Sequence, residues 1–442
     1  MNAREKLVFA AGSLLSKDFR DDVSRPPRGV EEARALARFG ALYQYAFDNV
    51  PYYRSKYGKA GLSRSFCATP AEVQRVPCLE KTEFGVNLTA RSSWGVALES
   101  GGTSGPKAST HLGWDYVVKR YGMLLRVLYG LGWEMGRPIS ALHPVEYGYW
   151  NNLPGMIRRG EAVKAVFEFV QQYVIYRGFH NRRNFYYSGD VFENGSGGDA
   201  LDQALRRKPF LVISRPDVLG YLVKRGLNDP SRREVAKALV VGNLTVLPAM
   251  KRVEDHLGCQ ALNMYASTEA GYMGLSCPRS GEWVHVDAAN YWVETDPAQD
   301  NEIIVTDLNN YGMPLIRYRT GDVGELSARV CACGRPGPML RVLGRKGRCL
   351  ENERGKKVFD ADVMSFFEDF PFLWAYQLCV EPGGKVAARV RAGEALGGRA
   401  EKALDEFCGK FGFARGRFRC DYSAPLSRSP SGKLQCIVTV SP

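Results

Sequence analysis

Apolar side chains recur along this 442-residue chain at two distinct spacings. Steps of three and four residues, typical of a helix with one buried face, occur at Leu36, Phe39, Leu42, Tyr43 and Ala46, and at Val117, Tyr121, Leu124, Leu125 and Leu128. Short continuous apolar runs, typical of buried strands, occur at residues 210–213, 238–241 and 303–305. Because helices alternate with such strands, the pattern predicts an α/β architecture with largely parallel sheets flanked by helices.

The character of the chain changes after Gly344 and Arg345. Residues 346–357 are highly charged and contain two glycines, as expected of a hinge or linker. Beyond this linker, strand-like patterns at 385–390 and 417–422 flank a helical pattern at 400–411. Such a pattern is typical of a compact α+β domain. We therefore predict a large N-terminal domain over residues 1–345 and a small C-terminal domain over residues 346–442.

Two other segments carry weaker signals. Residues 182–198 are rich in Asn, Gly and Ser, which predicts a surface excursion of the large domain. Residues 7–15 are apolar and follow Arg4 and Lys6, but charged residues come next instead of a small-residue cleavage site. This pattern favours an amphipathic helix over a signal peptide. No apolar run reaches a membrane-spanning length, and we expect a cytoplasmic protein.

Composition and charge narrow the class of partner. Hydrophobic residues make up 45% of the chain and charged residues 24%, which is typical of a globular protein. The net charge is +13, but Lys and Arg are scattered among 47 acidic residues, and no dense basic block alternates with aromatic side chains. The sequence therefore does not predict nucleic-acid binding. A basic field instead favours anionic substrates by electrostatic steering.

The densest cluster of loop-forming residues lies at positions 100–108. Its backbone N–H groups could wrap a polyphosphate, because glycine allows close approach, hydroxyl groups donate further hydrogen bonds and lysine adds charge. The spacing differs from the Walker and Rossmann patterns. By itself the run is equally typical of a Gly/Ser-rich turn. The residues in question are Ser100, Gly101, Gly102, Thr103, Ser104, Gly105 and Lys107.

Three further motifs follow in order: Tyr265-Ala266-Ser267-Thr268-Glu269, Tyr318-Arg319-Thr320-Gly321-Asp322 and Pro430-Ser431-Gly432-Lys433. Together with the glycine-rich run they resemble the adenylate-forming superfamily, and most closely its phenylacetate–coenzyme A ligase branch. The segment Asn49-Val50-Pro51-Tyr52-Tyr53 resembles that branch as well. The resemblance implies a large N-terminal domain that binds ATP and the acyl substrate, and a small, mobile C-terminal domain.

The resemblance also implies a role for each motif. The residues at 100–107 would hold the β- and γ-phosphates of ATP, and Thr268 would hydrogen-bond the α-phosphate. Glu269 would bind Mg²⁺, which prefers carboxylate oxygen together with phosphates and water. Tyr265 would lie against the adenine, beside Ala266 and Ser267. The carboxylate of Asp322 would accept hydrogen bonds from both ribose hydroxyls. Lys433 would be a mobile cation that reaches the reacting carboxylate and the α-phosphate. Taken alone, its position favours an exposed lysine in a C-terminal turn, and only the other motifs favour catalysis.

Two departures from the family pattern limit what the resemblance implies, the first for the polarity of the pocket and the second for acyl transfer. Where the family usually has Gly-Glu, this chain has Gly242-Asn243, in a segment that lines the nucleotide and acyl pocket. The family hinge usually reads Gly-Arg-x-Asp-Asp, whereas Lys346-Gly347-Arg348 follows Arg345 here. Arg345 could still approach the ribose, but the acidic pivot is missing. Adenylation is therefore predicted more firmly than transfer to coenzyme A.

Four metal-binding residue types fall into two groups along the chain. Cys331 and Cys333 form a tight pair beside a turn, and Cys277 is followed eight residues later by His285. Three thiolates and one imidazole make a complete tetrahedral set for a closed structural zinc site, which leaves no open position for catalysis. The alternative is a set of buried thiols and an ordinary histidine. The remaining cysteines are isolated, as expected of a reducing compartment.

The acyl substrate is weakly specified. Residues 143–150, from His143 to Trp150, are dense in aromatic side chains and could line a pocket for a flat acid or pack in a core. His143 and Glu146 could instead recognise a polar substituent. Three functions remain open: an acid–thiol ligase that uses ATP, Mg²⁺ and coenzyme A on a small carboxylic acid; an adenylating enzyme that passes the acyl group to an amine, a hydroxyl or a carrier-protein thiol; and an inactive nucleotide-binding subunit. The sequence does not specify an oligomeric state.

Overall fold

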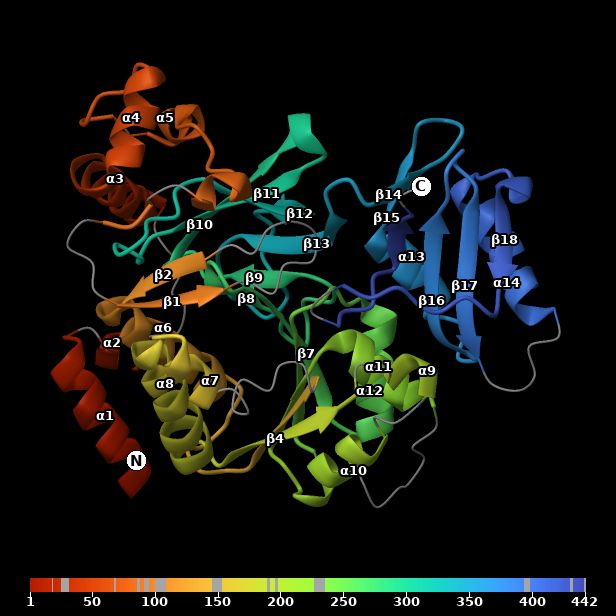
Figure 1. The fold of residues 1–442 in the computed structure, drawn as a ribbon, viewed down its shortest axis with the longest axis horizontal. Coiled ribbons are helices and arrows are strands. Elements are labelled where there is room, and N and C mark those ends of the chain that lie inside the picture. The colour runs from red at the N-terminus through yellow and green to blue at the C-terminus, as the bar shows by residue number, and fades with distance from the viewer. Residues whose placement is uncertain are drawn as a thin grey trace. The chain divides into compact units, whose positions relative to one another are not determined.

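The computed structural model describes residues 1–17, 19–24, 32–66, 69–85, 88–90, 95–99, 109–144, 153–188, 191–194, 198–225, 235–392, 398–429 and 432–440. The chain divides into two compact units (Figure 1). The first unit comprises Met1–Arg137, Tyr149–Asn181 and Met264–Arg341, and the second comprises Pro138–Gly148, Arg182–Asn263 and Val342–Pro442. We describe each unit by itself.

The first unit begins with helices and continues into a sheet. Its helices are α1 (Ala3–Leu15), α2 (Phe19–Ser24), α3 (Glu32–Asn49), α4 (Pro51–Lys59), α5 (Pro70–Arg75), α6 (Trp114–Gly130), α7 (Leu153–Arg158), α8 (Ala162–Phe169) and the π-helix η4 (Val170–Phe179), with 3-10 turns η1 (Lys81–Gly85) and η6 (Pro297–Gln299). The apolar spacing of α3 and α6 correctly predicts both helices, because Phe39, Leu42, Leu125 and Leu128 are buried.

Most of the sheet in the first unit is antiparallel. Its order is β10-β11-β12-β13-β9-β8-β7, where β7 (Gln260–Ser267) and β13 (Met339–Arg345) run across the boundary between the units. The other strands are β8 (Gly271–Leu275), β9 (Val284–Val286), β10 (Tyr291–Asp296), β11 (Glu302–Asp307) and β12 (Tyr318–Ser327). The run at 303–305 is a buried strand as predicted, but it pairs antiparallel with β10. The expectation of largely parallel sheets is therefore wrong for this unit.

The second unit contains the parallel part of the fold. Strands β4 (Arg182–Tyr187), β3 (Ile139–Pro144), β5 (Leu211–Ser214) and β6 (Lys237–Val241) lie side by side in this order, all parallel. Helices α9 (Val191–Asn194), α10 (Gly198–Arg206), α11 (Pro216–Lys224) and α12 (Leu247–Leu257) connect or follow them. The apolar runs at 210–213 and 238–241 are thus strands, as predicted. Continuous apolar runs suit parallel strands because both of their faces are buried.

The described residues of segment 182–198 do not form the surface excursion that its composition suggests. Residues Arg182–Tyr187 form the edge strand β4 beside β3. Tyr187, Val191 and Phe192 are buried in one core with Leu219 and Val240. The polar composition of the segment gave no indication of this strand, in which Tyr187 is buried and Phe185 is partly buried against the core. A residue count over the window therefore misread it.

The C-terminal part of the second unit is the predicted α+β fold. It contains β14 (Cys349–Glu351), β15 (Lys357–Phe359), α13 (Asp360–Phe367), β16 (Leu373–Val380), β17 (Val386–Ala392), α14 (Arg399–Phe411), η7 (Arg415–Arg417), β18 (Phe418–Asp421) and β19 (Ile437–Thr439). A four-stranded sheet, β18-β17-β16-β19, has α14 beside it (Figure 1). Its core is rich in phenylalanine, with Phe366, Phe367 and Phe407 in mutual contact.

Residues on both sides of the predicted 345/346 boundary belong to the second unit. Ala375 and Leu426, from the C-terminal part, share a core cluster with Leu219 and Val240. The border between two compact units need not coincide with the hinge about which a domain rotates. The domain boundary at 345/346 therefore stays a prediction. Residues 7–15 lie in α1 as expected, although Leu7, Leu14 and Leu15 are exposed. None of the helices in the described ranges is long and apolar enough to cross a membrane.

Candidate functional site

In the first unit, the turn between β7 and β8 carries one of the predicted motifs. Tyr265, Ala266 and Ser267 end β7, and Thr268, Glu269 and Ala270 form the turn into β8. The pairing of β7 with β8 shifts register between Tyr265 and Ala266, which is a β-bulge or a similar irregularity. Such features are frequent next to functional sites because they redirect side chains.

The structure brings two of the separated motifs into contact. The Tyr265 hydroxyl donates a hydrogen bond to Asp322 Oδ2 at 2.8 Å, across 57 positions of sequence. Asp322 lies on β12 just after Gly321, which has a φ of +75°. Its backbone N–H donates to Thr320 Oγ1 at 3.1 Å. The carboxylate predicted to hold the ribose is thus fixed beside the ring predicted to hold the adenine.

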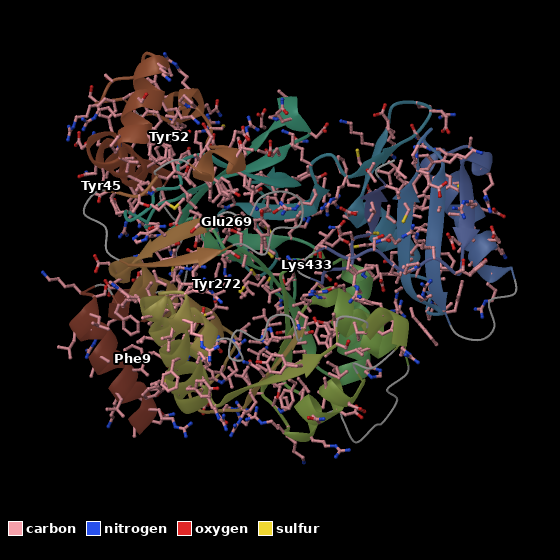
Figure 2. The ribbon with its side chains drawn as sticks, viewed as in Figure 1. Phe9, Tyr45, Tyr52, Glu269, Tyr272 and Lys433 are labelled. Carbon is pink, nitrogen blue, oxygen red and sulfur yellow. The ribbon has the colours of Figure 1, made fainter. Side chains whose placement is uncertain are left out.

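Glu269 is buried, with 6% of its surface exposed, and is labelled in Figure 2. Its Oε1 atom lies 3.4 Å from Lys81 Nζ at the start of η1. A buried carboxylate needs a cation or hydrogen-bond donors to offset its lost hydration. Lys81 supplies that charge here, and Glu269 is the residue that the sequence predicts to bind Mg²⁺. The sequence analysis did not identify Lys81.

A buried polar network lies beneath the Thr268–Ala270 turn. Arg120 on α6 donates to the carbonyl of Thr268 at 3.3 Å. The hydroxyls of Tyr116 and Tyr291 both donate to the carbonyl of Ala270, at 3.2 Å and 2.7 Å. Tyr116 also hydrogen-bonds Asp307, and burial raises the pKa of Asp307 to about 6. These contacts hold the turn by its backbone and leave the side chains of Thr268 and Glu269 for other partners.

In the second unit, Lys433, which is labelled in Figure 2, lies in a turn held by hydrogen bonds to Ser429. Its backbone N–H donates to Ser429 Oγ at 3.1 Å, and its carbonyl accepts from the N–H of Ser429 at 3.0 Å. Gly432 has a φ of +70°, a conformation that glycine adopts without strain. The other two residues of the predicted motif, Pro430 and Ser431, lie outside the described residues.

Gly242 and Asn243 follow β6 at the carboxyl end of the parallel strands, the edge where open α/β sheets bind ligands. Gly242 has a φ of +87°, and the side-chain amide of Asn243 donates to the carbonyl of Leu434 at 3.2 Å. Asn243 therefore contacts the residue after Lys433. A glutamate at this position could not donate that bond while ionised.

The predicted hinge has an acidic neighbour that the motif comparison missed. Asp360 is 8% exposed and begins α13, and a Cβ atom on Gly344 would lie 2.9 Å from Asp360 Oδ2. Asp360 Oδ1 accepts the N–H of Ile437 at 3.0 Å. Burial raises the pKa of Asp360 to about 6, against the opposing effects of Arg348 and Arg345. An acid thus faces Gly344 and Arg345, although it comes from a position 15 residues beyond Arg345.

The four predicted metal ligands come together in the first unit. The ligand atoms of Cys277, His285, Cys331 and Cys333 all lie within 4.8 Å of one another. The Sγ atoms of Cys277 and Cys331 are 3.7 Å apart, and His285 Nε2 is 3.4 Å from Cys277 Sγ and 3.4 Å from Cys333 Sγ. Tetrahedral zinc with bonds of about 2.3 Å to sulfur places two thiolates about 3.8 Å apart. These three distances are therefore close to those expected around a tetrahedral zinc ion.

Other predicted residues are placed less fully. The phosphate-binding candidates Ser100, Gly101, Gly102, Thr103, Ser104, Gly105 and Lys107 lie outside the described residues, as do residues 145–150 of the aromatic run. The described residues on either side of the first run, Glu99 on β1 (Gly95–Glu99) and Ser109 on β2 (Ser109–Gly113), face each other in an antiparallel pair. His143 Nε2 lies 2.9 Å from Arg182 Nη2, and burial lowers the pKa of His143 to about 3.

Comparisons with known proteins agree with the motifs. No family model matches the chain. It is 24% identical to a phenylacetate–coenzyme A ligase of Thermus thermophilus over 397 residues, covering 83% of this chain and 82% of the relative. A phenylacetate–coenzyme A ligase of Escherichia coli is 24% identical over 383 residues, covering 80% of each chain. The solved structure of 2-hydroxyisobutyryl-CoA ligase with R3-HIB-AMP has a TM-score of 0.70 at 17% identity, covering 92% of this chain and 89% of that one.

The fold is that of the adenylate-forming ligases, and the resemblance carried by the ordered motifs is confirmed. Within that class, the chain is similar to the phenylacetate–coenzyme A ligase branch. Lys81, Arg120 and Asp360 are site residues that the motifs do not predict. A charged residue within an apolar helical pattern, as Arg120 is between Val117 and Tyr121, was a usable signal for one of them. The other two belong to no motif.

Proposed function

We propose that this protein activates a small carboxylic acid with ATP and then transfers the acyl group to coenzyme A. The observation that carries the proposal is the Tyr265–Asp322 hydrogen bond, in the unit whose β7–β8 turn presents Thr268 and Glu269. Similarity to phenylacetate–coenzyme A ligases over four fifths of the chain supports it. The first step joins a carboxylate oxygen to the α-phosphorus and releases pyrophosphate.

Each proposed role follows from charge and donor chemistry. Both reactants are anionic, so the site must supply cations, N–H donors and precise positioning instead of a covalent nucleophile. Tyr265 and Asp322 hold the nucleoside, and Thr268 donates to the α-phosphate. Glu269 holds Mg²⁺, which when bound neutralises phosphate charge. Lys433 supplies the cation that balances charge on the reacting carboxylate and α-phosphate, while residues 100–107 hold the outer phosphates.

The acyl acceptor is the part of the proposal with a specific alternative. The missing Asp-Asp pair after Arg345 favours an enzyme that passes the acyl group to an amine, a hydroxyl or a carrier-protein thiol. The buried carboxylate of Asp360 beside Gly344 supports coenzyme A instead, because it supplies an acid to the hinge from elsewhere in the sequence. We therefore propose coenzyme A as the acceptor.

Pyrophosphate exchange with a panel of carboxylic acids tests the first step. Exchange that depends on phenylacetate or another small aromatic acid would support the proposal, and absence of exchange with every acid would identify a nucleotide-binding protein without catalysis. Adding coenzyme A tests the second step: thioester should accumulate with release of AMP. If a stable acyl-adenylate reacts only with an amine, a hydroxyl or a carrier-protein thiol, the protein is an adenylating enzyme with that acceptor and not a coenzyme A ligase.

We also propose that Cys277, His285, Cys331 and Cys333 hold a structural zinc ion. The fit of the interatomic distances to tetrahedral coordination supports this role. Four protein ligands leave no position for water or substrate, so the ion would stabilise the loops that carry its ligands. Elemental analysis of protein purified without chelators tests it. A cytoplasmic location, consistent with free thiols, likewise remains a proposal that cell fractionation would test.

A further inference from the structure

Two charged residues at the start of α11 form a bidentate pair. Arg215 Nε lies 3.1 Å from Asp217 Oδ1, and Arg215 Nη2 lies 2.6 Å from Asp217 Oδ2. Both side chains are buried, at 8% and 7% exposed. A buried pair of this kind is geometrically specific because the planar guanidinium matches both carboxylate oxygens. It belongs to none of the motifs that define the proposed reaction.

This pair contacts the turn that carries Lys433. Arg215 Nη2 also donates to the carbonyl of Gly432 at 2.7 Å, and Asp217 Oδ2 accepts the N–H of Leu434 at 3.2 Å. The pair therefore bonds the residue before Lys433 and the residue after it. Arg215 donates to a carbonyl and Asp217 accepts from an N–H two residues further on. The two bonds together therefore fix the register of the turn as well as its position.

Asn243 provides a third contact on the same backbone. Its side-chain amide donates to the carbonyl of Leu434, the residue whose N–H is held by Asp217. The Leu434 side chain is partly buried against the core cluster that contains Val218 and Leu219 of α11. Both polar groups of Leu434 and its side chain are thus engaged by residues of the 215–243 region.

We infer that Arg215, Asp217 and Asn243 form a latch that positions Lys433 for the adenylate-forming step. This inference rests on the proposed function. The three bonds of the latch involve backbone atoms of residues 432 and 434, and the Lys433 side chain takes no part in them. This role also accounts for asparagine in place of the acidic residue usual in the family, because an amide can donate to a carbonyl and a carboxylate cannot.

The latch should affect the two half-reactions unequally. Displacing a reacting group by about 1 Å can cost about 100-fold in rate, so Arg215→Gln and Asp217→Asn should lower the maximal rate of pyrophosphate exchange by about 10- to 100-fold. The KM for ATP should change by less than about 3-fold, since the proposed nucleotide contacts come from Tyr265, Thr268 and Asp322 and not from Arg215 or Asp217. Thioester formation from pre-formed phenylacetyl-adenylate and coenzyme A should also change by less than about 3-fold.

Trypsin supplies a readout that does not depend on activity. Lys433 and Arg428 are the cleavage sites in this turn, and release of the turn should accelerate cleavage there by about 10-fold or more in the intact protein. Arg419→Gln is the matched control, because Arg419 pairs with Glu381 at 2.6 Å elsewhere in the same C-terminal part. Asn243→Asp is the second variant if the others fail to fold, because it keeps the side-chain shape and replaces the amide donor with a carboxylate that cannot donate to the Leu434 carbonyl.

The outcomes separate the latch from the proposed function. Faster cleavage together with a selective loss of exchange would support the inference. Unchanged cleavage and exchange in Arg215→Gln and Asn243→Asp would overturn it. Equal losses in both half-reactions, with a lower melting temperature, would overturn the positioning role in favour of general stabilisation. A third outcome is that trypsin cleaves the wild-type protein slowly and the variants fast, while no acid supports exchange. In that case the proposed function is wrong, and the latch has no catalytic role.

Discussion

Tyr265 donates a hydrogen bond of 2.8 Å to Asp322, which joins two motifs that lie on different strands of one unit. The bond restricts the orientation of the Asp322 carboxylate. It also ties the bulge in β7 to β12. In a nucleoside bound here, Tyr265 would contact the adenine ring while Asp322 binds the ribose.

Replacing Asp322 should weaken nucleotide binding. Asp322→Ala removes two charge-assisted hydrogen bonds, and we expect the Kd for ATP to rise by about 30- to 100-fold. Tyr265→Phe, which removes only the hydroxyl, should cost less than 10-fold, about 1 kcal/mol. Calorimetric titration with ATP checks both values. Glu325→Ala, an exposed acid on the same strand, is the control, and an ATP affinity of Asp322→Ala equal to that of the control would reject the nucleotide site.

Replacing Glu269 should change the magnesium requirement. Glu269→Gln keeps the shape of the side chain but removes the charge, so the Mg²⁺ concentration for half-maximal exchange should rise by about 10-fold. The ion pair with Lys81 would be lost in the same variant. Exchange rates measured over a magnesium titration check this, with Glu161→Gln, a half-buried ion-paired acid, as the control. An unchanged titration would show that Glu269 serves only Lys81.

Removing the charge of Lys433 should abolish most adenylation while ATP still binds. A cation lost from a transition state costs about 3–4 kcal/mol, so Lys433→Ala should lower pyrophosphate exchange by about 10²- to 10³-fold. The Kd for ATP should stay close to that of the wild type. Lys385→Ala, an exposed lysine of the same C-terminal part, is the control. Near-normal exchange in Lys433→Ala would exclude its catalytic role.

The cysteine–histidine cluster should contain about one zinc ion per chain. Cys331→Ser should lose that metal and lower the melting temperature, since metal-binding free energy contributes to folding. Metal loss should increase at acid pH, because thiolate and imidazole ligands bind only when deprotonated. Elemental analysis and thermal unfolding check this, with Cys420→Ser, a thiol outside the cluster, as the control. Metal-free wild-type protein of unaltered stability would falsify the site.

Asp360 should make stability depend on pH. Burial raises its pKa from 3.8 to about 6, so the folded state binds its proton more tightly than the unfolded state does. Its contribution to the free energy of unfolding is therefore present below pH 4 and is lost as the pH rises to about 6, by up to about 3 kcal/mol. Asp360→Asn should flatten this window. Denaturant unfolding at pH 4.5 and pH 7 checks it; identical pH profiles of the variant and the wild type would contradict the prediction.

Local patterns predicted the elements of this fold well, because helix and strand periods reflect which side chains of one segment are buried. The helices at 36–46 and 117–128 and the strands at 210–213 and 238–241 were identified on that ground. The patterns did not predict the direction of strand pairing. The run at 303–305 is fully buried in an antiparallel sheet, and burial in a parallel sheet would give the same apolar pattern. The prediction for residues 182–198 was wrong because the polar composition of the segment does not show that residues 182–187 form a strand.

The sequence by itself determined which chemistry the chain carries: the order of the motifs, the donor set of three cysteines and one histidine, and the lysine after Gly432. Tertiary structure decided which of these groups meet. The pairing of β9 with β13, where His285 faces Met339, helps bring Cys277 and His285 to Cys331 and Cys333. The partners of the Lys433 turn, Arg215, Asp217 and Asn243, lie about 190 to 220 positions away in the chain, and Asp360 reaches Gly344 from the start of α13. Contacts between distant residues depend on how strands pair and how helices pack, and these are properties of the whole fold.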